Sequence, residues 1–359
     1  MGTDARSATG ASTQPVLAFV PRIREQAAKW IGIGLLLVVL FWLVENAVKD
    51  WHQFVIVSLN GVTNGSIYAL VAIGYTLVYG ILELINFAHG DVFSWGAVVT
   101  STVALSWLGV HGGESGFSLF GSLLAAMLAA AGFCALLNMA VERVAYRRLR
   151  NAPRLAPLIT AIGMSFVLSN MIAVFYGFSY VSTNPILPTG AIFHVGNQAY
   201  GWDKLIVLLI TFPALLGLTF VVKQTRWGKA MRATAQNRDA ARLMGIDVDR
   251  AISFAFGLGG ALAGVGGFVY FVYFTQARFD LGFRIGLFAF TAAVLGGIGN
   301  IAGAALGGYV IGFIENWNSG LTWNAPGPAW TESLVFILLI LILVFRPHGI
   351  LGETLSQRS

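Results

Sequence analysis

Charged residues are scarce in this chain. Asp, Glu, Lys and Arg together make up 11% of its 359 residues, whereas hydrophobic residues make up 57%. A soluble domain carries charge at about a quarter of its positions, so the composition excludes that class. It predicts an all-α polytopic membrane protein with about 8–10 transmembrane helices, some of them broken or re-entrant. The net charge of +6 does not indicate nucleic acid binding, because the basic residues cluster between apolar stretches.

Cysteine is nearly absent as well. Cys134 is the one cysteine of the sequence, and it lies within an apolar run, which excludes a disulfide framework and a cysteine metal site. The sequence also lacks a P-loop pattern and any polar region long enough to hydrolyse a nucleotide. We therefore expect no metal, no cofactor bound by this chain and no enzymatic activity. Energy for transport has to come from an ion gradient or from another polypeptide.

Long charge-free stretches alternate with basic clusters along the chain. About 20 apolar residues are needed to cross the hydrocarbon core of a membrane, so these stretches predict membrane spans. The loops at 109–117 and 178–202 hold no Lys or Arg and are expected outside. The charge-free stretches are 54–82, 92–110, 116–141, 155–181, 205–222, 251–277 and 285–314, with shorter candidates at 30–44 and 333–345.

The basic clusters predict how the chain is oriented. Residues 143–154, the loop 223–250 and Arg346 are expected on the cytoplasmic side, together with both termini. We divide the chain into a flexible cytoplasmic extension at 1–29, a transmembrane domain at 30–352 and a cytoplasmic tail at 353–359.

The stretch 285–314 has to cross the membrane an even number of times in this arrangement. Its centre reads GGIGN (296–300) and contains three glycines. Irregular backbone at membrane depth is tolerated where protein or a water-filled cavity covers it. We therefore predict two half-helices here, as a re-entrant pair or as two short spans. Asn300, at the end of this break, is a candidate pathway residue or a helix cap. Glu315, which closes the stretch, could likewise line the pathway or cap.

Polar residues recur on one face of the span at 54–82. Asn60, Asn64 and Tyr68 are four residues apart, so they share one side of a helix. We interpret this side as lining a translocation pathway. The alternative is that buried amides hold packed helices together, with Gly61 and Gly65 allowing close approach.

A second polar segment, ELINFAHGD at 83–91, separates two apolar stretches. At a helix break, Asn86, His89 and Asp91 would line the pathway, and half-helix ends would face a zwitterionic solute. The alternative is a short cytoplasmic turn in which Asp91 caps the next helix. Adjacent ligands that could complete a metal site are missing.

The loop 223–250 collects seven basic and three acidic residues between uncharged flanks. Its central part predicts a short helix that starts at Asp239 and ends before Gly245 at the C′ position. Apolar side chains in so charged a loop favour docking into a partner, while 223–232 also suits contact with anionic membrane lipid. The candidate docking residues are Asp239, Arg242, Leu243, Met244, Gly245 and Asp247.

Four stretches of the sequence form a recognisable pattern: NGVTNGSIYALVAIGYTLVYGILELINFAHGD (60–91), TRWGKAMRATAQNRDAARLMGIDVDR (225–250), VLGGIGNIAGAALGGYVIGFIE (294–315) and FRPHGILG (345–352). In them the chain resembles the permease subunits of ABC importers for branched-chain and other hydrophobic amino acids. The resemblance covers roughly residues 54–352.

The resemblance implies a permease domain in a bacterial plasma (inner) membrane and a set of partners. These are a second, homologous permease, two cytoplasmic ATPases that use ATP, and an extracytoplasmic solute-binding protein. Residues 239–249 would be the coupling helix that meets an ATPase. Urea or short-chain amides are alternative solutes within the same family. An ion-coupled secondary transporter is the alternative outside it, although most spans lack the embedded charges that such transporters use.

Overall fold

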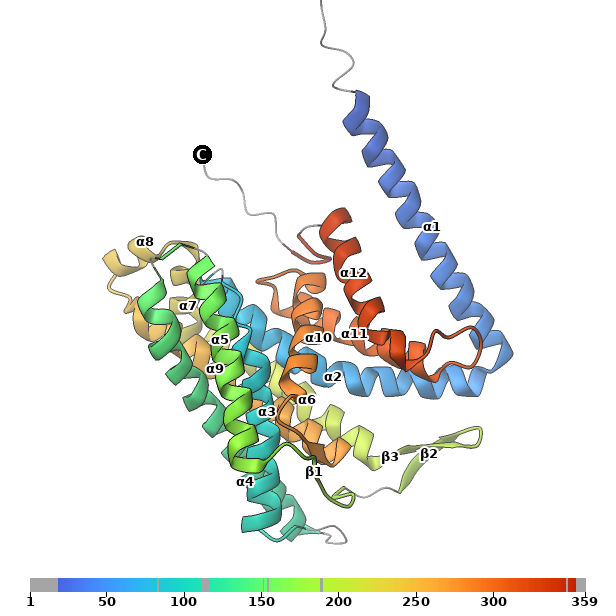
Figure 1. The fold of residues 1–359 in the computed structure, drawn as a ribbon, viewed down its shortest axis with the longest axis horizontal. Helices are drawn as coiled ribbons and strands as arrows, with labels where there is room; N and C mark the ends of the chain where they lie inside the picture. The colour runs from blue at the N-terminus through green and yellow to red at the C-terminus, as the bar shows by residue number, and fades with distance from the viewer. Residues whose placement is uncertain are drawn as a thin grey trace, which may run out of the picture. The chain divides into compact units, whose positions relative to one another are not determined.

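The computed structural model describes residues 19–82, 84–110, 116–150, 152–153, 155–187, 190–346 and 348–352. They belong to two units, one ending at Lys49 and one beginning at Asp50, which we describe separately. Helices dominate both (Figure 1), and seven of those described are long and apolar enough to cross a membrane. The expected all-α polytopic class is confirmed.

The first unit contains helix α1, Phe19–Lys49. The helix begins well before residue 30, where the sequence predicts the end of a flexible extension. Pro21 lies in its first turn, where the missing N–H of proline costs nothing. At its other end Lys49 pairs with Glu45 at 3.0 Å, with the acidic residue first and the basic residue beside the helix C-terminus, as the helix dipole favours.

The second unit holds the other helices and four short strands. Its longest helices are α2 (Trp51–Leu82), α4 (Phe117–Val141) and α9 (Val248–Phe274). The others are α3 (Ala88–Ser101), η1 (Thr102–Trp107), η2 (Glu142–Tyr146), η3 (Arg147–Leu149), α5 (Leu155–Tyr176), α6 (Trp202–Gln224), α7 (Arg226–Gln236), α8 (Arg238–Leu243), α10 (Leu281–Gly296), α11 (Ile301–Gly320), η4 (Pro328–Trp330) and α12 (Thr331–Phe345).

Helices α2 and α9 form the centre of this unit. In the most apolar part of α2, 89% of the residues are buried, against 72% in α9 and 22% in each of α4, α5 and α6. The latter three helices therefore present most of their apolar side chains outward, as lipid-facing helices do, because lipid tails are as apolar as a protein core.

Glycines bring the central helices into backbone contact. A Cβ added at Gly260 of α9 would lie 2.3 Å from the Cys134 carbonyl oxygen of α4. A Cβ at Gly312 of α11 would lie 2.4 Å from the Gly65 Cα of α2. Side chains have no room at these crossings, so the helices pack through small residues in the way common to membrane proteins.

The predicted break between two half-helices lies between α10 and α11. Gly297 and Gly299 have φ angles of 108° and 94°, which glycine adopts at little cost. The segment 348–352 closes the break: the amides of Ile350 and Leu351 donate to the carbonyls of Leu295 (2.8 Å) and Gly296 (3.0 Å). These bonds satisfy the carbonyl groups that the end of α10 leaves without a helical partner.

Two small antiparallel sheets lie in loops for which the sequence predicted no strands. Strand β1 (Val181–Ser182) pairs with β4 (Gln276–Ala277), and β2 (Ala191–Val195) pairs with β3 (Gln198–Gly201). Strands this short carry no readable alternation of apolar and polar residues. Tyr200 in β3 is buried, and this burial raises the pKa of its hydroxyl.

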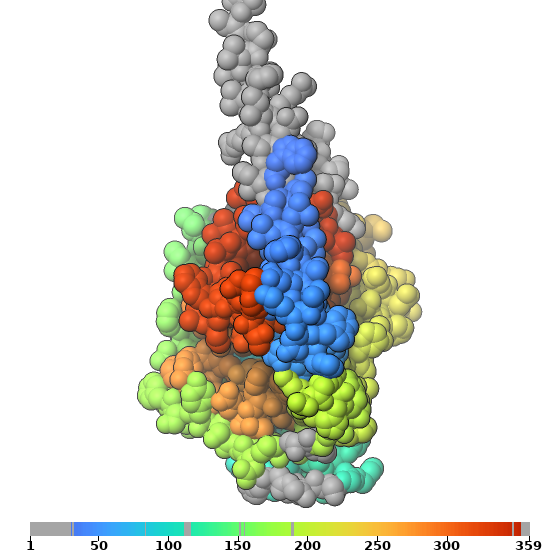
Figure 2. All heavy atoms as spheres, turned by 90° about the vertical axis from the view of Figure 1, so that its right-hand side faces the viewer, coloured from blue at the N-terminus to red at the C-terminus, as the bar shows by residue number. Residues whose placement is uncertain are grey.

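The loops of the second unit gather at two ends (Figure 1). The basic end holds η2, η3, α7, α8 and the segment 348–352; the hairpin end holds the four strands and the start of α2. Gln198 of the hairpin donates to Gln53 of α2. Figure 2 shows α12 and its preceding loop in red above the yellow-green hairpin. The loops predicted to be cytoplasmic and those predicted to lie outside are thus at opposite ends.

Candidate functional site

Helices α7 and α8 are shaped by side-chain caps. The Thr225 hydroxyl accepts from the Gly228 amide at the start of α7. The Asn237 side chain accepts from the amides of Asp239 and Ala240, both at 3.0 Å, at the start of α8. The cap therefore lies two residues before Asp239, and the prediction that Asp239 begins this helix is wrong. Asn237 has the extended backbone that points a cap at the free amides, and Asp239 sits inside the first turn.

The end of α8 confirms the predicted glycine C′ position. Gly245 has a φ of 79°, its amide donates to the Arg242 carbonyl, and the Ile246 amide donates to the Ala241 carbonyl. This is the Schellman arrangement. Ala241 is buried and anchors the helix. Asp247 then caps α9 by accepting from the Arg250 amide at 3.0 Å.

The remaining predicted docking residues point away from the protein. Leu243 and Met244 are 89% and 82% exposed, although they are large and apolar. Asp239 and Arg242 pair with each other at 3.3 Å on the same exposed helix. We call Asp239, Arg242, Leu243 and Met244 the docking surface.

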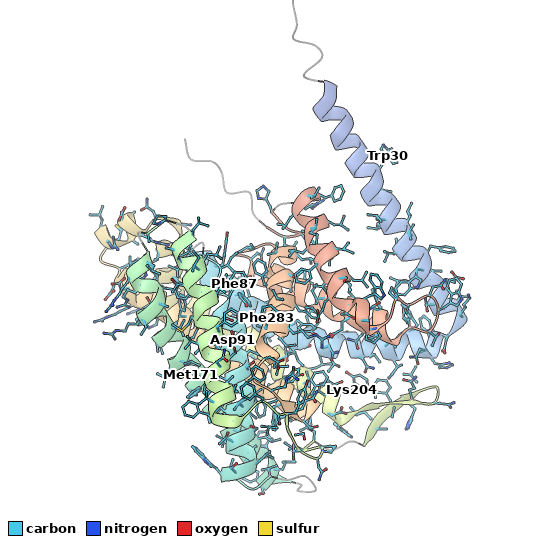
Figure 3. The ribbon with its side chains drawn as sticks, viewed as in Figure 1. Trp30, Phe87, Asp91, Met171, Lys204 and Phe283 are labelled. Atoms are coloured by element: carbon cyan, nitrogen blue, oxygen red, sulfur yellow. The ribbon has the colours of Figure 1, made fainter. Side chains whose placement is uncertain are left out.

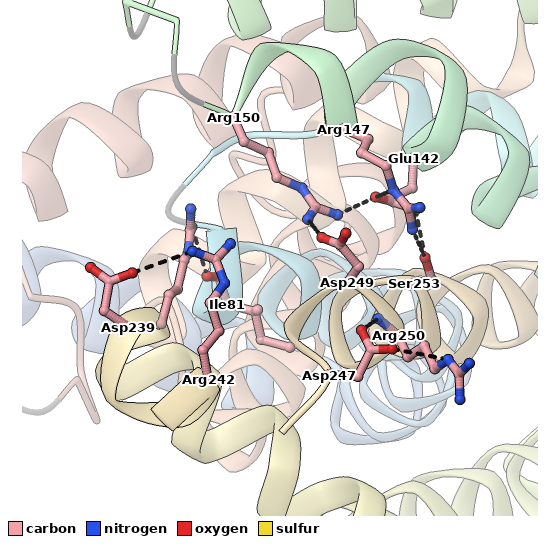
Figure 4. A network of polar contacts seen from close by, with 11 residues as sticks. Ile81, Glu142, Arg147, Arg150, Asp239, Arg242, Asp247, Asp249, Arg250 and Ser253 are labelled. Atoms are coloured by element: carbon pink, nitrogen blue, oxygen red, sulfur yellow. Dashed lines mark hydrogen bonds and ion pairs between the residues drawn. The ribbon is translucent and has the colours of Figure 1, made fainter. Parts of the chain in front are cut away.

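A buried carboxylate, Glu142, holds the start of α9, the helix that follows the docking surface in the chain (Figure 4). Glu142 is fully buried and accepts from the Ser253 hydroxyl of α9 at 2.6 Å, from Arg147 and from Arg150. Arg150 also pairs with Asp249 at the start of α9. Sequence reasoning missed Glu142, because it treated the basic cluster beside it only as a sign of orientation.

The docking surface is also joined to α2. Arg238, the first residue of α8, donates to the carbonyls of Ile81 (3.2 Å) and Leu82 (3.3 Å) at the C-terminus of α2. A cation at this position complements the helix dipole. Beside it a cavity of about 400 Å³ opens between the end of α2, Pro157 of α5 and residues 234–238, so this surface of the basic end is concave.

The polar face of α2 meets charged residues from three other helices. The Tyr68 hydroxyl donates to Glu315 Oε2 of α11 at 2.6 Å. Arg284 of α10 lies 3.6 Å from Glu315 Oε1 and 3.5 Å from Glu332 Oε1 of α12. We call Asn60, Asn64, Tyr68, Arg284, Glu315 and Glu332 the α2–α11 polar cluster.

Sequence reasoning found half of this cluster. The spacing of Asn60, Asn64 and Tyr68 placed them on one side of α2, but it could not identify the helix that faces them. Glu315 was considered only as a possible lining or capping residue, and Arg284 was missed. The sequence did contain a signal, because Arg284 and Glu315 stand immediately before and after the charge-free stretch 285–314.

The predicted pathway residues at the break between α2 and α3 are buried, and they make a different set of contacts from the α2–α11 polar cluster. Asn86, His89 and Asp91 are each at most 2% exposed. Asn86 accepts from the Tyr146 hydroxyl at 2.8 Å, and Asp91 accepts from the Ser165 hydroxyl. These contacts tie α3 and the preceding break to η2 and α5.

Asp91 does not cap α3, so that interpretation is wrong. The helix begins after Phe87, which supplies no side-chain cap, and Asp91 lies one turn further along, between α3 and α5 (Figure 3). The His89 ring packs edge-on against the Tyr75 ring, with 4.8 Å between the two ring centroids. Across the described residues, His, Cys, Asp and Glu form no group of three or more that could hold a metal.

Asn300 lies at the break between α10 and α11. Its side-chain oxygen accepts from the Gly303 amide at 3.1 Å, and its side-chain amide donates to the Leu351 carbonyl at 2.8 Å. The structure therefore shows Asn300 as the cap of α11 and as a link to the segment 348–352.

A family model described as the permease component of branched-chain amino acid transport systems matches residues 57–344. The chain belongs to this family. BraD of Pseudomonas aeruginosa, a high-affinity branched-chain amino acid transport system permease protein, is 38% identical over 82% of this chain and 94% of its own length. LivH of Escherichia coli, described in the same terms, is 40% identical over the same shares.

Two further proteins are less similar to this chain. A probable branched-chain amino acid transport permease protein, LivH of Methanocaldococcus jannaschii, is 31% identical over 86% of this chain and 96% of its own length. A solved structure, PsaBC from Streptococcus pneumoniae in complex with Fab, covers 86% of this chain and 97% of that one at 15% identity and a TM-score of 0.41. This structural likeness is too low to carry an argument.

The part of the permease that matches the family contains both candidate sites. The match begins within α2 and ends within α12, so it spans the docking surface and the α2–α11 polar cluster. Helix α1 lies outside it.

Proposed function

We propose that this chain is the membrane permease of an ATP-driven importer and forms part of the pathway for branched-chain or other hydrophobic amino acids. The relatives with 38% and 40% identity over nearly their whole length are described as permease proteins of branched-chain amino acid transport systems. One observation on this chain carries the ATP-driven part of the proposal: Leu243 and Met244 are almost fully exposed at the tip of a capped helix. Exposed apolar anchors amid charge are what a partner's cleft would cover.

The proposed partners at the basic end are two cytoplasmic ATPases, which bind and hydrolyse ATP. Arg238 connects the docking surface to the C-terminus of α2, and Asp249, at the start of the following helix α9, is joined through Arg150 to Glu142. A movement of α8 would therefore be passed to α2 and α9, the two central helices. This is how hydrolysis on another polypeptide would open and close a pathway in this one.

The proposed partners in the membrane and outside complete the importer. Arg284 is half-exposed at the edge of the α2–α11 polar cluster, which leaves that cluster open on one side. A second, homologous permease would close it. An extracytoplasmic solute-binding protein would deliver the solute to the hairpin end. In this arrangement the chain lies in the bacterial inner membrane with both termini in the cytoplasm.

The test is uptake of radiolabelled leucine by proteoliposomes that contain the complete transporter purified from its native membrane with all co-purifying subunits. We expect uptake only with ATP at the face that carries the ATPases, and no loss of uptake when ionophores collapse the ion gradients. Uptake driven by a gradient without ATP would replace the proposal with ion-coupled transport. Uptake of urea or acetamide in preference to leucine would replace the solute class.

A further inference from the structure

The α2–α11 polar cluster contains three ionised side chains from three helices in a chain that is otherwise poor in charge. Arg284 is in the first turn of α10, Glu332 is in the first turn of α12, and Glu315 is about one turn from the end of α11. All three therefore lie toward the hairpin end. Charges within membrane helices are costly and mark functional sites by default.

The charged groups of this cluster are incompletely paired with one another. Arg284 lies 3.6 Å from Glu315 and 3.5 Å from Glu332, whereas a hydrogen-bonded pair of this kind is about 2.7–2.9 Å apart. The guanidinium has five N–H donors in a fork that matches a carboxylate. Its donors are thus available to a ligand carboxylate.

Acceptor oxygens gather on the other side of the cluster. The side-chain oxygens of Asn60 and Asn64 are buried and have no hydrogen-bond partner among the described residues. Both lie on the side of α2 that carries Tyr68. Tyr68 donates to Glu315 Oε2 and so leaves Oε1 toward Arg284. Buried acceptors without donors are costly, and an ammonium group supplies three donors.

We propose that the α2–α11 polar cluster binds the zwitterionic head group of an α-amino acid as it enters the pathway. Arg284 takes the α-carboxylate, and Glu315 Oε1 with the side-chain oxygens of Asn60 and Asn64 takes the α-ammonium. The two ligand groups are attached to one carbon atom, which matches a site where the opposite charges of the protein are 3.6 Å apart. Phe288 lies under both Arg284 (5.5 Å) and Tyr68 (5.6 Å) and forms the apolar floor. This inference rests on the proposed function and names the part of the solute that the chain recognises.

The test uses the complete transporter in proteoliposomes and measures ATP-driven uptake of radiolabelled leucine. Arg284→Ala and Glu315→Gln are each expected to lower the maximal rate about tenfold or more, the effect of losing one charge-assisted hydrogen bond. Arg284→Lys keeps the charge but not the fork and is expected to fall between Arg284→Ala and the unaltered chain. Glu45→Gln removes a carboxylate from α1, outside the cluster and outside the part that matches the family, and is expected to leave the rate within about twofold.

Tyr68→Phe separates recognition from packing. It removes the hydrogen bond to Glu315 but leaves the carboxylate charged, whereas Glu315→Gln keeps an oxygen for Tyr68 and removes the charge. Charge recognition predicts a much larger loss for Glu315→Gln. Equal losses in the two variants would mean that the contact only holds α2 to α11, and would overturn the proposal.

The outcomes also separate this inference from the proposed function. Normal uptake by assembled Arg284→Ala and Glu315→Gln transporters would overturn the binding site while leaving leucine transport established. An unaltered transporter that moves no amino acid would overturn the proposed function itself. Assembly is checked by co-purification of the subunits. Should Arg284→Ala not assemble, Arg284→Lys and Glu315→Gln decide the matter, since both keep the size and polarity of the original side chain.

Discussion

At the scale of single residues, the contact between α2 and α11 depends on glycines, which have no side chain. Gly312 and Gly65 face each other so closely that a Cβ on Gly312 would lie 2.4 Å from the Gly65 Cα and 2.5 Å from the Gly61 carbonyl oxygen. This contact is made by backbone atoms, which cannot turn aside as the end of a flexible side chain can. It also sets the distance at which Tyr68 reaches Glu315.

Gly312→Ala is therefore expected to destabilise the chain. The added methyl group forces α2 and α11 apart at a cost of about 1–3 kcal/mol, the usual range for overpacking. The measurement is the thermal unfolding midpoint of the purified protein in detergent. Gly217→Ala is the matched control, because a Cβ at Gly217 in α6 meets nothing within 4 Å and alanine favours a helix. A midpoint that falls equally in both variants, or in neither, would contradict the backbone contact.

The same scale shows what sequence reasoning can and cannot find at a site. A four-residue spacing identified Asn64 and Tyr68 as neighbours on one helix face, because helical periodicity is a local property. Their partners Arg284 and Glu315 are more than 200 positions away, and no local pattern states which helices pack together. The N-cap of α8 was misassigned for a smaller reason: Asn237 and Asp239 both suit a cap, and only the backbone angles distinguish them.

At the scale of elements, the long helices were predictable and the paired strands were not. The charge-free stretch 54–82 corresponds to α2 (51–82), and 116–141 corresponds to α4 (117–141). The glycine-rich break at 296–300 is present between α10 and α11. Strands β1 and β4 pair across nearly a hundred residues, and such a pairing depends on the fold and not on the composition of either strand.

Helix α8 makes a prediction as a docking element. Replacing Arg242 and Leu243 together by Ala removes a charge and a large apolar side chain from the docking surface, and it is expected to weaken association with the ATPase at least about tenfold. The caps at Asn237 and Gly245 stay in place, so membrane insertion and folding are expected to continue. The measurement is the amount of ATPase that co-purifies with the permease from membranes.

Lys229→Ala is the control for this experiment. Lys229 is exposed on the neighbouring helix α7 and lies outside the docking surface. We expect this variant to retain the ATPase at the level of the unaltered chain. Equal retention by the Arg242/Leu243 double variant would show that the ATPase binds elsewhere.

At the scale of the whole molecule, the second unit has two distinct ends. The basic end carries the docking surface and the ion pairs of Glu142 with Arg147 and Arg150. The hairpin end carries the strands and an ion pair between Arg278 and Asp280, and this pairing raises the pKa of Arg278. From the positive-inside rule we expect the basic end to face the cytoplasm.

This orientation can be tested with single cysteines, because the native Cys134 is fully buried. Asn197→Cys introduces a thiol in the exposed turn of the hairpin, and Lys229→Cys introduces one at the basic end. A membrane-impermeant maleimide is expected to label Asn197→Cys in intact cells whose outer membrane has been opened. It should label Lys229→Cys only after the inner membrane is permeabilised. The unaltered chain serves as the unlabelled control, and the reverse pattern would invert the orientation.

The segment 348–352 has a consequence for how the protein is made. Its amides satisfy the carbonyls of Leu295 and Gly296, and a Cβ at Gly297 would meet Gly352 at 2.4 Å, so the two segments are in contact. The corner between α10 and α11 therefore stays incomplete until the ribosome has translated the residues that follow α12. A polypeptide that ends at residue 347 would keep the membrane-spanning helices found among the described residues but expose unsatisfied carbonyl groups at that corner. The cell's quality-control proteases could then recognise such unfinished copies before they join an importer.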